Sequence, residues 1–405
     1  MTNIYYLYNK NLDKNYFDLK RFADEELSFK VIENGTIIPN KRGKNIPGWW
    51  GTGGIFDAQG KFVAGSFPVE ISDEAFEPPA ETGKSSETVV YLGLFSPSWG
   101  HSITINLQSL WFLQSDAFKT EFKNCRLAYI PWWSGKENLY IGDKKSLARL
   151  LEILEVDVSA LQPITQPTQF DKIVLPDRSF FIGDGKMLFT NEYRETIERV
   201  RDFALKNSTP TSSKKIYYFY GRTQTGEERL ADYFKSKGYE IVLPENLPLD
   251  EQLNILANCE SFASTLGSCS HNSIFLPNDA EVILIPRSPN VFTAYQQTID
   301  QVHPSRINYI DSSLSLFGGV HGPNCFIISK QLKSFFGDKF DGYVTEDFKT
   351  FLEYVKDSIG KKNTVNRMAR KHYGKFFPDF MAQLRRRPKL IASCDMPPDW
   401  QKKLL

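Results

Sequence analysis

The feature that most constrains the fold is a regular alternation of apolar runs and amphipathic segments between residues 214 and 287. The apolar runs are typical of buried strands and cover 214–222, 239–246, 261–267 and 280–287. The segments between them have helical patterns and cover 226–238, 247–260 and 270–278. Strands that alternate with helices form a parallel sheet covered by helices, so this part of the chain predicts a doubly wound, Rossmann-like domain.

A second alternation precedes the first. Strand patterns at 88–95, 125–131 and 170–177 are separated by helical patterns at 102–118 and 144–157, which is a βαβαβ order. Residues 48–71 predict an antiparallel hairpin that turns at Asp57–Gly60, and the polar stretch 207–213 predicts a linker. We therefore expect an α/β protein with two Rossmann-like domains facing a cleft, over residues 1–206 and 207–335, and a helical C-terminal segment, 336–405.

Composition excludes several classes of protein. The 405 residues, 41% of them hydrophobic, can bury at least one large core, and the net charge of +1 gives no global signal for nucleic acid. The first twenty residues lack the basic-then-apolar order of a signal peptide, so a cytoplasmic location is expected. Five scattered cysteines without a CxxC pair favour reduced thiols, and five histidines without paired spacing predict no metal site.

The C-terminal segment is locally basic. Residues 361–389 contain ten Lys or Arg and one acidic residue, interleaved with Phe376, Phe377 and Phe380. Two interpretations stay open. The pattern favours a solvated helical tail, and the alternative is a patch that holds the protein against an anionic membrane surface or a polyanionic glycan.

Polar residues follow each predicted strand of the second domain, at the edge where open α/β sheets bind ligands. In chain order they are Arg222 with Arg229 one to two helical turns later, Glu245, the Gly267–Ser268 turn, and Arg287. Fixed cations and unsatisfied backbone N–H groups at a helix N-terminus suit an anionic diphosphate. Structural alternatives are a salt bridge of Arg229 near Glu227 or Glu228, Ser268 as an N-cap only, a packed or capping His271, and a buried hydrogen-bonding Asn272.

The first domain offers a histidine and paired tryptophans at its strand ends. His101 starts the helix after the strand 88–95, and an imidazole there can act as a general base for an acceptor hydroxyl. Trp132 and Trp133 end the second strand and can form a platform for a sugar ring, and Asp177 ends the third. The alternatives are a helix-capping histidine and a hydrophobic lid.

Four separate blocks carry a family pattern: GGIFDAQGKFVAGS, GHSITINLQSLWFL, YGR with Arg229 downstream, and VLPENLPLDEQLNILANCESFASTLGSCSHNSIFLP. In this order they resemble glycosyltransferase family 61, over roughly residues 50 to 290. The resemblance implies a GT-B-like enzyme that transfers a sugar from a nucleotide donor with inversion at the anomeric carbon. The matching positions are Gly100, His101, Arg222, Glu251, Gln252, Gly267, Ser268, His271, as in bacterial-type members, and Asn272.

Two positions depart from the family pattern. Leu266 stands where plant-type members have a histidine, and Asn106 stands where many relatives have an acidic residue. The second departure removes one candidate base, which favours His101 and leaves Asp177 and Asp184 as alternatives.

We therefore expect an inverting glycosyltransferase that moves a sugar from a nucleoside-diphosphate donor, with UDP as the expected nucleotide, to a hydroxyl of a glycan or lipid-linked glycan. The catalytic residues would be His101 and Arg222; the donor would contact Arg222, Arg229, Glu245, Gln252, Gly267, Ser268, His271 and Asn272; and the acceptor would contact Trp132, Trp133 and Asp177. No cofactor or metal is expected. The resemblance implies bacterial capsule, lipopolysaccharide or other surface polysaccharide synthesis at the inner membrane face.

Two other functions remain alternatives. The first is a non-catalytic carbohydrate- or nucleotide-binding module on the same fold. The second is a hydrolase with Ser268 or Ser270 as nucleophile, but GSCSH lacks the second glycine of a nucleophile elbow.

Overall fold

The computed structural model describes residues 3–7, 19–21, 26–42, 51–68, 78–132, 146–183, 186–221, 224–287, 294–302, 305–314, 325–342, 344, 346–347 and 349–350. The chain divides into two compact units: unit 1 is Met1–Tyr16, Pro210–Asn246 and Asn258–Leu405, and unit 2 is Phe17–Thr209 and Leu247–Ala257. A mixed α/β fold is confirmed. Two Rossmann-like domains that face a cleft, and the linear boundaries at 206 and 335, stay predictions.

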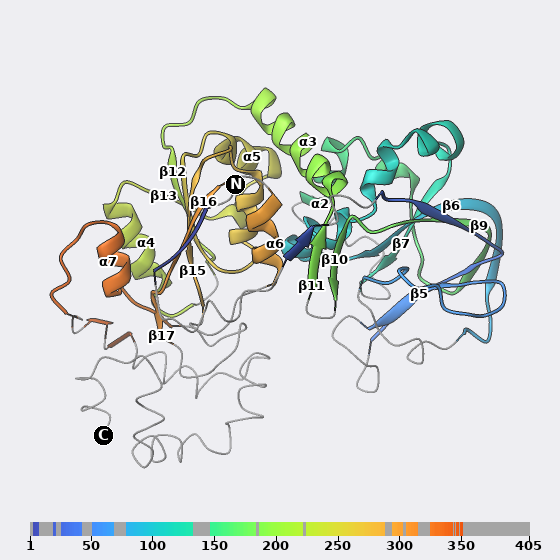
Figure 1. Ribbon diagram of the computed structural model, residues 1–405, viewed down its shortest axis with the longest axis horizontal. Helices are drawn as coiled ribbons and strands as arrows, with labels where there is room; N and C mark the ends of the chain where they lie inside the picture. Colours follow the sequence, from blue (N-terminus) through green and yellow to red (C-terminus); the bar gives the residue numbers. More distant parts are fainter. Residues whose placement is uncertain are drawn as a thin grey trace, which may run out of the picture. The chain divides into compact units, whose positions relative to one another are not determined.

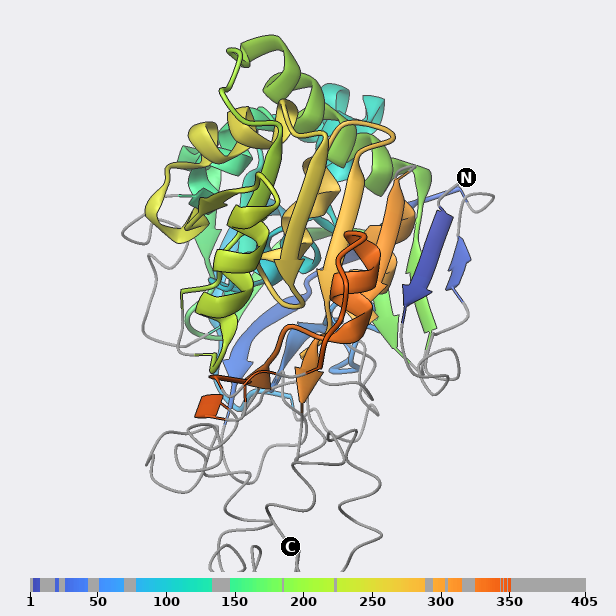
Figure 2. The same cartoon turned by 90° about the vertical axis from the view of Figure 1, so that its left-hand side faces the viewer.

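Unit 1 is built on a six-stranded parallel sheet (Figures 1 and 2). Its strands, in spatial order, are β1 (Asn3–Leu7), β16 (Arg306–Ile310), β15 (Glu281–Ile285), β14 (Ser261–Thr265), β12 (Lys215–Tyr218) and β13 (Glu240–Val242). The four strands predicted between 214 and 287 are confirmed. β16 extends the sheet, and the N-terminal strand β1 pairs with it in parallel.

Helices α4 (Glu227–Ser236) and α7 (Lys330–Phe335) pack on one face of this sheet. Leu230 and Phe234 of α4 and Leu332 of α7 form one core with Tyr217 and Ile283 of the strands. Burial of each such side chain contributes roughly 1.5–3 kcal/mol. The other elements of unit 1 are the 3₁₀ helices η8 (Pro244–Asn246) and η9 (Ser270–Phe275), helix α6 (Ala294–Val302), and the antiparallel pair β17 (Ser313–Leu314) and β18 (Cys325–Phe326).

Unit 2 contains a mixed sheet. Strand β9 (Thr168–Pro176) lies in its middle, with β6 (Gly83–Phe95), β7 (Arg126–Pro131) and β8 (Leu161–Pro163) following in parallel on one side. β3 (Phe29–Glu33) and β4 (Thr36–Lys41) pair antiparallel with β9, and β5 (Thr52–Phe56) pairs antiparallel with β4. A small second sheet contains β2 (Leu19–Arg21), β10 (Phe180–Gly183) and β11 (Lys186–Phe189).

The turn predicted at Asp57–Gly60 is present, because the Asp57 N–H donates to the Lys61 carbonyl at 2.9 Å and Asp57 Oδ1 accepts from the Gln59 and Lys61 N–H groups. After the turn the chain makes one antiparallel bridge, between Phe56 and Phe62, and the strand that pairs with β5 is β4. The hairpin prediction was therefore correct for the turn and incomplete for the strand partner.

The helix predicted over 102–118 is not a continuous α-helix. The structure has a four-residue α1 (Trp99–Ser102), 3₁₀ segments η3 (Ile105–Leu107) and η4 (Leu110–Gln114), and a π segment, η5 (Phe118–Phe122). Thr104 Oγ1 donates to the Gly100 carbonyl at 2.8 Å, and the Asn106 side chain binds the backbone of Ser96. Polar side chains that bond to the backbone compete with the helical pattern, which explains the interruption.

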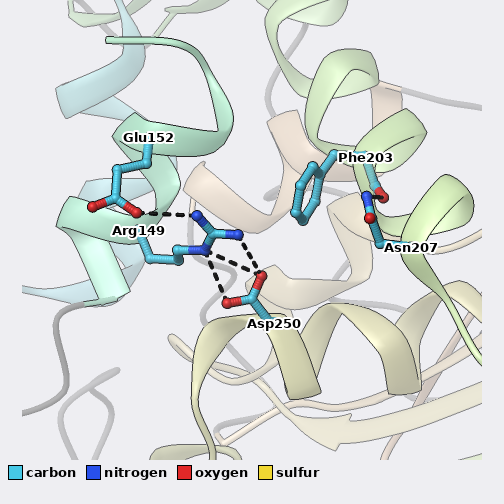
Figure 3. Close-up of polar contacts among 5 residues, drawn as sticks. All are labelled: Arg149, Glu152, Phe203, Asn207 and Asp250. Carbon is cyan, nitrogen blue, oxygen red and sulfur yellow. Dashed lines mark hydrogen bonds and ion pairs between the residues drawn. The ribbon is translucent and has the colours of Figure 1, made fainter. Parts of the chain in front are cut away.

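The helix predicted at 144–157 is confirmed as α2 (Ser146–Ile153), and unit 2 also contains α3 (Asn191–Asn207). Helix α5 (Leu249–Ala257) packs against α3 and α2 in unit 2, although its neighbours in sequence, β13 and β14, belong to unit 1. Arg149 of α2 contacts Asp250 of α5 and lies 5.4 Å from the ring centroid of Phe203 in α3 (Figure 3). Unit 2 also has a 3₁₀ turn, η7 (Val158–Ala160).

No helix in the described part of the chain is long and apolar enough to span a membrane. The basic segment 361–389 lies outside the described residues, so its helical structure and its membrane contact stay predictions.

Candidate functional site

The strand order of unit 1 reverses between β12 and β14. From β12 the chain passes to β13 at the edge of the sheet, and the next strand, β14, pairs on the other side of β12. Open α/β sheets bind ligands outside the carboxyl ends of the strands at such a switch point, because the loops diverge there. The segments that follow β12 and β14 are therefore the candidate site in unit 1.

Gly267, just after β14, leaves room for the guanidinium of Arg287, just after β15. A Cβ built on Gly267 would lie 2.8 Å from Cζ of Arg287, which real Cβ atoms do not tolerate, and the glycine has a positive φ of 149°. Only glycine combines this backbone conformation with such a close approach. Gly267 therefore leaves room for a cation against the turn at the switch point.

Two residues that follow β12 also contact Arg287. Its Cζ lies 4.7 Å from the ring centroid of Tyr220, a cation–π distance. With the Gln224 amide oriented to satisfy its hydrogen bonds, the amide oxygen accepts from Nε and Nη2 of Arg287 at 3.2 and 3.1 Å. Arg287 is thus held by the ends of three strands, β12, β14 and β15.

Glu227, the first residue of α4, is buried between the ends of β12 and β14. Its Oε1 accepts from the Tyr220 N–H at 3.2 Å and from Thr265 Oγ1 at 3.0 Å, and the residue is 1% exposed. Burial raises the pKa of this carboxyl to about 7, while its hydrogen bonds and the charge of Arg287 act to lower it. Its Oε2 has no hydrogen-bond partner among the residues that the structure describes.

The turn after β14 is held by Ser270. Ser270 Oγ accepts from the Gly267 N–H at 3.0 Å and lies 2.8 Å from the Gly267 carbonyl and 2.6 Å from Oε1 of Gln296 in α6. The predicted Ser268 cap was wrong. The helix is a six-residue 3₁₀ segment whose N-cap is Cys269, without a side-chain hydrogen bond. A short 3₁₀ segment has little dipole, so the predicted helix N-terminus contributes little to an anion site.

His271 and Asn272 are buried in η9, at 6% and 2% exposure. The His271 ring lies 6.3 Å from the ring of Tyr295, and Asn272 Nδ2 donates to the Cys269 carbonyl at 3.0 Å. These positions match the structural alternatives for both residues. Their contact with a donor stays a prediction.

The other predicted donor residues are placed differently. Glu245 in η8 follows β13, and its Oε1 is 3.4 Å from the position that a Cβ on Gly221 would take, so the carboxyl lies beside the end of β12. Arg229 forms an ion pair with the buried Asp347, rather than with the predicted neighbours Glu227 or Glu228. Gln252 lies in α5 of unit 2, where its Nε2 donates to the Leu247 carbonyl at 3.0 Å. Arg222 lies outside the described residues.

In unit 2, His101 and Trp132 come together at the carboxyl ends of β6 and β7. The two rings stack with centroids 5.5 Å apart and an 18° angle between their planes, and His101 Nδ1 is 3.1 Å from Ser96 Oγ. Burial lowers the pKa of His101 to about 4, so the ring is neutral at pH 7. A neutral imidazole can accept a proton, which a general base requires.

Trp132 is 4% exposed, with the Arg42 guanidinium 5.0 Å from its ring centroid and its carbonyl accepting from Asn40 Nδ2 at 3.0 Å. The ring therefore does not present an open face in this conformation, and the acceptor platform stays a prediction. Trp133 lies outside the described residues.

Asn106 and one alternative base, Asp177, both have structural hydrogen bonds. The Asn106 side chain accepts from the Ser96 N–H and donates to the Ser96 carbonyl, both at 2.9 Å. Asp177 Oδ2 accepts from the N–H and the Oγ of Ser28, at 2.9 and 2.6 Å. Both side chains therefore have structural bonds, and Asp184 lies outside the described residues.

Sequence reasoning did not assign two residues to this site. Arg287 was named among the polar residues at the ligand edge but not as a donor contact, and Glu227 was named only as a neighbour of Arg229. The PR dipeptide after the apolar run AEVILI was the available signal for Arg287, but its contact with Gly267 exists only in the tertiary structure. Within the described ranges, no three His, Cys, Asp or Glu side chains are grouped closely enough to hold a metal ion.

Comparison with known proteins gives one family. None of the curated proteins matches the chain. Residues 99–283, which include α1 with His101 and the switch-point strands β12 and β14, match the family model described as Glycosyltransferase 61. The expected resemblance to glycosyltransferase family 61 is therefore confirmed over residues 99–283.

Proposed function

We propose that this protein transfers a sugar from a nucleoside-diphosphate donor to a hydroxyl of a glycan or lipid-linked glycan, with inversion at the anomeric carbon. The single observation that carries the proposal is the Arg287 guanidinium, held beside Gly267 at the switch point of a parallel sheet. The match of residues 99–283 to the glycosyltransferase family model supports the transfer reaction. A fixed cation at a strand-end turn supports an anionic leaving group, because the diphosphate gains negative charge as the glycosidic bond breaks.

The strand ends of unit 1 suggest how the donor is oriented. In dinucleotide-binding sheets, the diphosphate lies at the switch point and an acidic residue beyond it binds the ribose hydroxyls. Arg287 and Gly267 would contact the diphosphate, and Glu245, beside the end of β12, would accept from the ribose. Arg222, between Tyr220 and Gln224 in the sequence, would supply a second cation. We expect UDP as the nucleotide and no metal requirement.

His101 would accept the proton of the acceptor hydroxyl. Its pKa of about 4 makes it neutral but weakly basic, so it cannot deprotonate a hydroxyl in the ground state. As the new bond to the anomeric carbon forms, the hydroxyl oxygen becomes positive and its proton becomes acidic. Transfer to His101 would therefore occur late in a single displacement. The setting that we propose is bacterial surface polysaccharide synthesis, in the cytoplasm at the inner face of the membrane.

The test combines ligand binding with transfer. A nucleotide sugar in excess of its Kd must raise the unfolding temperature, so a thermal-shift screen against nucleotides and nucleotide sugars identifies the donor. Arg287→Ala should lose roughly 10²–10³-fold in turnover while the chain remains folded. Arg306→Ala is the matched control, because Arg306 is the first residue of β16, at the strand end opposite to the carboxyl ends that form the site, and it pairs with Glu281. Full activity of Arg287→Ala would overturn the proposed site.

The same experiment separates the alternatives. A silent binding module would show the thermal shift with a nucleotide sugar and no transfer to any glycan. A hydrolase would be labelled by a fluorophosphonate at Ser268 or Ser270. Ser270 is 0% exposed and its Oγ is engaged with Gly267 and Gln296, so we expect no labelling there.

A further inference from the structure

Glu227 is a buried carboxyl group that the proposed transfer reaction does not use. It joins the ends of the two switch-point strands, because one oxygen accepts from both the Tyr220 N–H and Thr265 Oγ1. The other oxygen is buried without a hydrogen-bond partner among the described residues. A buried ionised carboxylate with half of its hydrogen-bonding capacity unmet is costly unless a nearby positive charge compensates it.

Arg287 supplies that positive charge. It contacts Tyr220, whose N–H binds Glu227, and Gly267, which lies two residues after Thr265. The guanidinium charge acts to lower the pKa of Glu227, against burial, which raises it to about 7. The free protein therefore has Glu227 balanced between its two protonation states near neutral pH.

We propose that Glu227 is a positioning residue of the anion site, and that it takes up a proton when a diphosphate binds at Arg287. This inference rests on the proposed donor site. The diphosphate brings at least two negative charges to the guanidinium, which then compensates Glu227 less. The carboxylate becomes less stable relative to the carboxylic acid, and a proton moves from solvent to Glu227 as the ligand binds. Protonation also removes the negative charge that the buried Glu227 carboxylate would otherwise hold without full compensation.

The other ionisable groups near Glu227 do not provide this response. Burial, with the charge of Glu227, raises the pKa of the Tyr217 phenol of β12 far above the neutral range, so it stays protonated. Arg229, two residues along α4, is paired with Asp347. Among the described residues of unit 1, Asp300 in α6 also has a pKa raised to about 7 by burial, and it bonds to Gln296 and Tyr309 rather than to Arg287.

The linkage between proton uptake and ligand binding determines how the affinity for the ligand changes with pH. A group whose pKa rises on binding takes up protons, so affinity is highest below the pKa of the free protein and falls as the pH rises through it. If binding raises the pKa by one unit, affinity falls by about tenfold in total, and binding at pH 7.5 takes up about half a proton. Deprotonation of the terminal phosphate of UDP, near pH 6, changes affinity in the opposite direction because it adds negative charge.

The experiment is calorimetric titration of the full chain with UDP at pH 7.5, in three buffers of different ionisation enthalpy. The slope of the observed enthalpy against buffer ionisation enthalpy gives the number of protons taken up. We expect the wild type to take up about half a proton more than Glu227→Gln, since glutamine keeps the acceptor oxygen for Tyr220 and Thr265 but does not titrate. Asp300→Asn is the matched control and should take up as many protons as the wild type.

Each outcome has one meaning. Equal proton uptake by the wild type and Glu227→Gln overturns the inference while the donor site stands. If the extra uptake is lost in Asp300→Asn and kept in Glu227→Gln, the proton is taken up by Asp300. That result also overturns the inference. If UDP and the other nucleotides fail to bind the wild type, the proposed donor site itself is wrong. If Glu227→Gln does not fold, the affinity of the wild type for UDP is measured from pH 6.5 to 8.5 instead. An affinity that stays constant or rises over this range overturns the inference.

Discussion

The guanidinium of Arg149 and the carboxylate of Asp250 form a bidentate ion pair, with Nε 2.9 Å from Oδ2 and Nη2 3.0 Å from Oδ1 (Figure 3). The pair joins α2 to α5, the helix that unit 2 takes from the sequence between β13 and β14. Its side chains are 37% and 51% exposed, so water screens the attraction, and such pairs contribute about 0.2–1 kcal/mol. The apolar face of α5, with Leu249, Leu253 and Leu256 buried, must therefore provide most of its stability.

This comparison gives the first prediction. Leu253→Ala should lower the free energy of unfolding by about 2–5 kcal/mol, because it removes a fully buried side chain and leaves a cavity. Asp250→Ala should cost less than about 1 kcal/mol. Urea unfolding of both variants measures the difference. A larger loss for Asp250→Ala than for Leu253→Ala would show that the ion pair, and not the leucines, holds α5.

Gly267→Ala should displace Arg287 and weaken nucleotide binding. The new methyl group would occupy the space of the guanidinium, and alanine is strained at the positive φ. Gly238→Ala is the matched control, because Gly238 also has a positive φ, of 84°, but a Cβ there would meet nothing within 4 Å. Both variants should lose about 1 kcal/mol or more of stability, and only Gly267→Ala should lose the thermal shift with UDP. Equal shifts in the two variants would disprove the role of the Gly267–Arg287 contact.

Ser270 and Ser268 should differ sharply in their effect on stability. Ser270→Ala removes the partner of the Gly267 N–H and of Gln296 Oε1 in a buried site, at a cost of about 1–3 kcal/mol. Ser268 makes no side-chain cap, so Ser268→Ala should stay within about 0.5 kcal/mol of the wild type. Thermal or urea unfolding checks this pair. Similar losses in both would restore the sequence-based assignment of Ser268 as the cap.

His101 should make the stability depend on pH. Its pKa is lowered from 6.5 to about 4 by burial, so the unfolded chain takes up a proton before the folded chain does. The contribution of the neutral His101 ring to the free energy of unfolding is therefore present in full above about pH 6.5. It declines as the pH falls toward 4, and about 2 kcal/mol is lost at pH 5. His101→Gln should lack this part of the decline. Urea unfolding at pH 7.5 and pH 5 measures it, and an identical decline in the two proteins would contradict the assigned burial.

Much of the architecture could be predicted from the sequence. The runs that became β6, β7, β9, β12, β14 and β15 are apolar and bounded by turn residues, and the amphipathic helices α2, α3 and α4 have clear periodicity. The interrupted segment 102–118 could not be predicted, because its apolar spacing is helical while Thr104 and Asn106 bond to the backbone instead. That competition depends on where the strand end at Ser96 lies in space.

The sequence by itself determined the alternation of strands and helices, the resemblance to the glycosyltransferase family, and the chemical types at each strand end, because these depend on local periodicity and on residue identity. The tertiary structure decided which of those residues meet. It paired β1 with β16, gave α5 to unit 2, joined Arg229 to Asp347, and placed Arg287 in the space that Gly267 leaves open. These are contacts between residues far apart in the chain. They follow from how whole elements bury their apolar faces together, which no local pattern encodes.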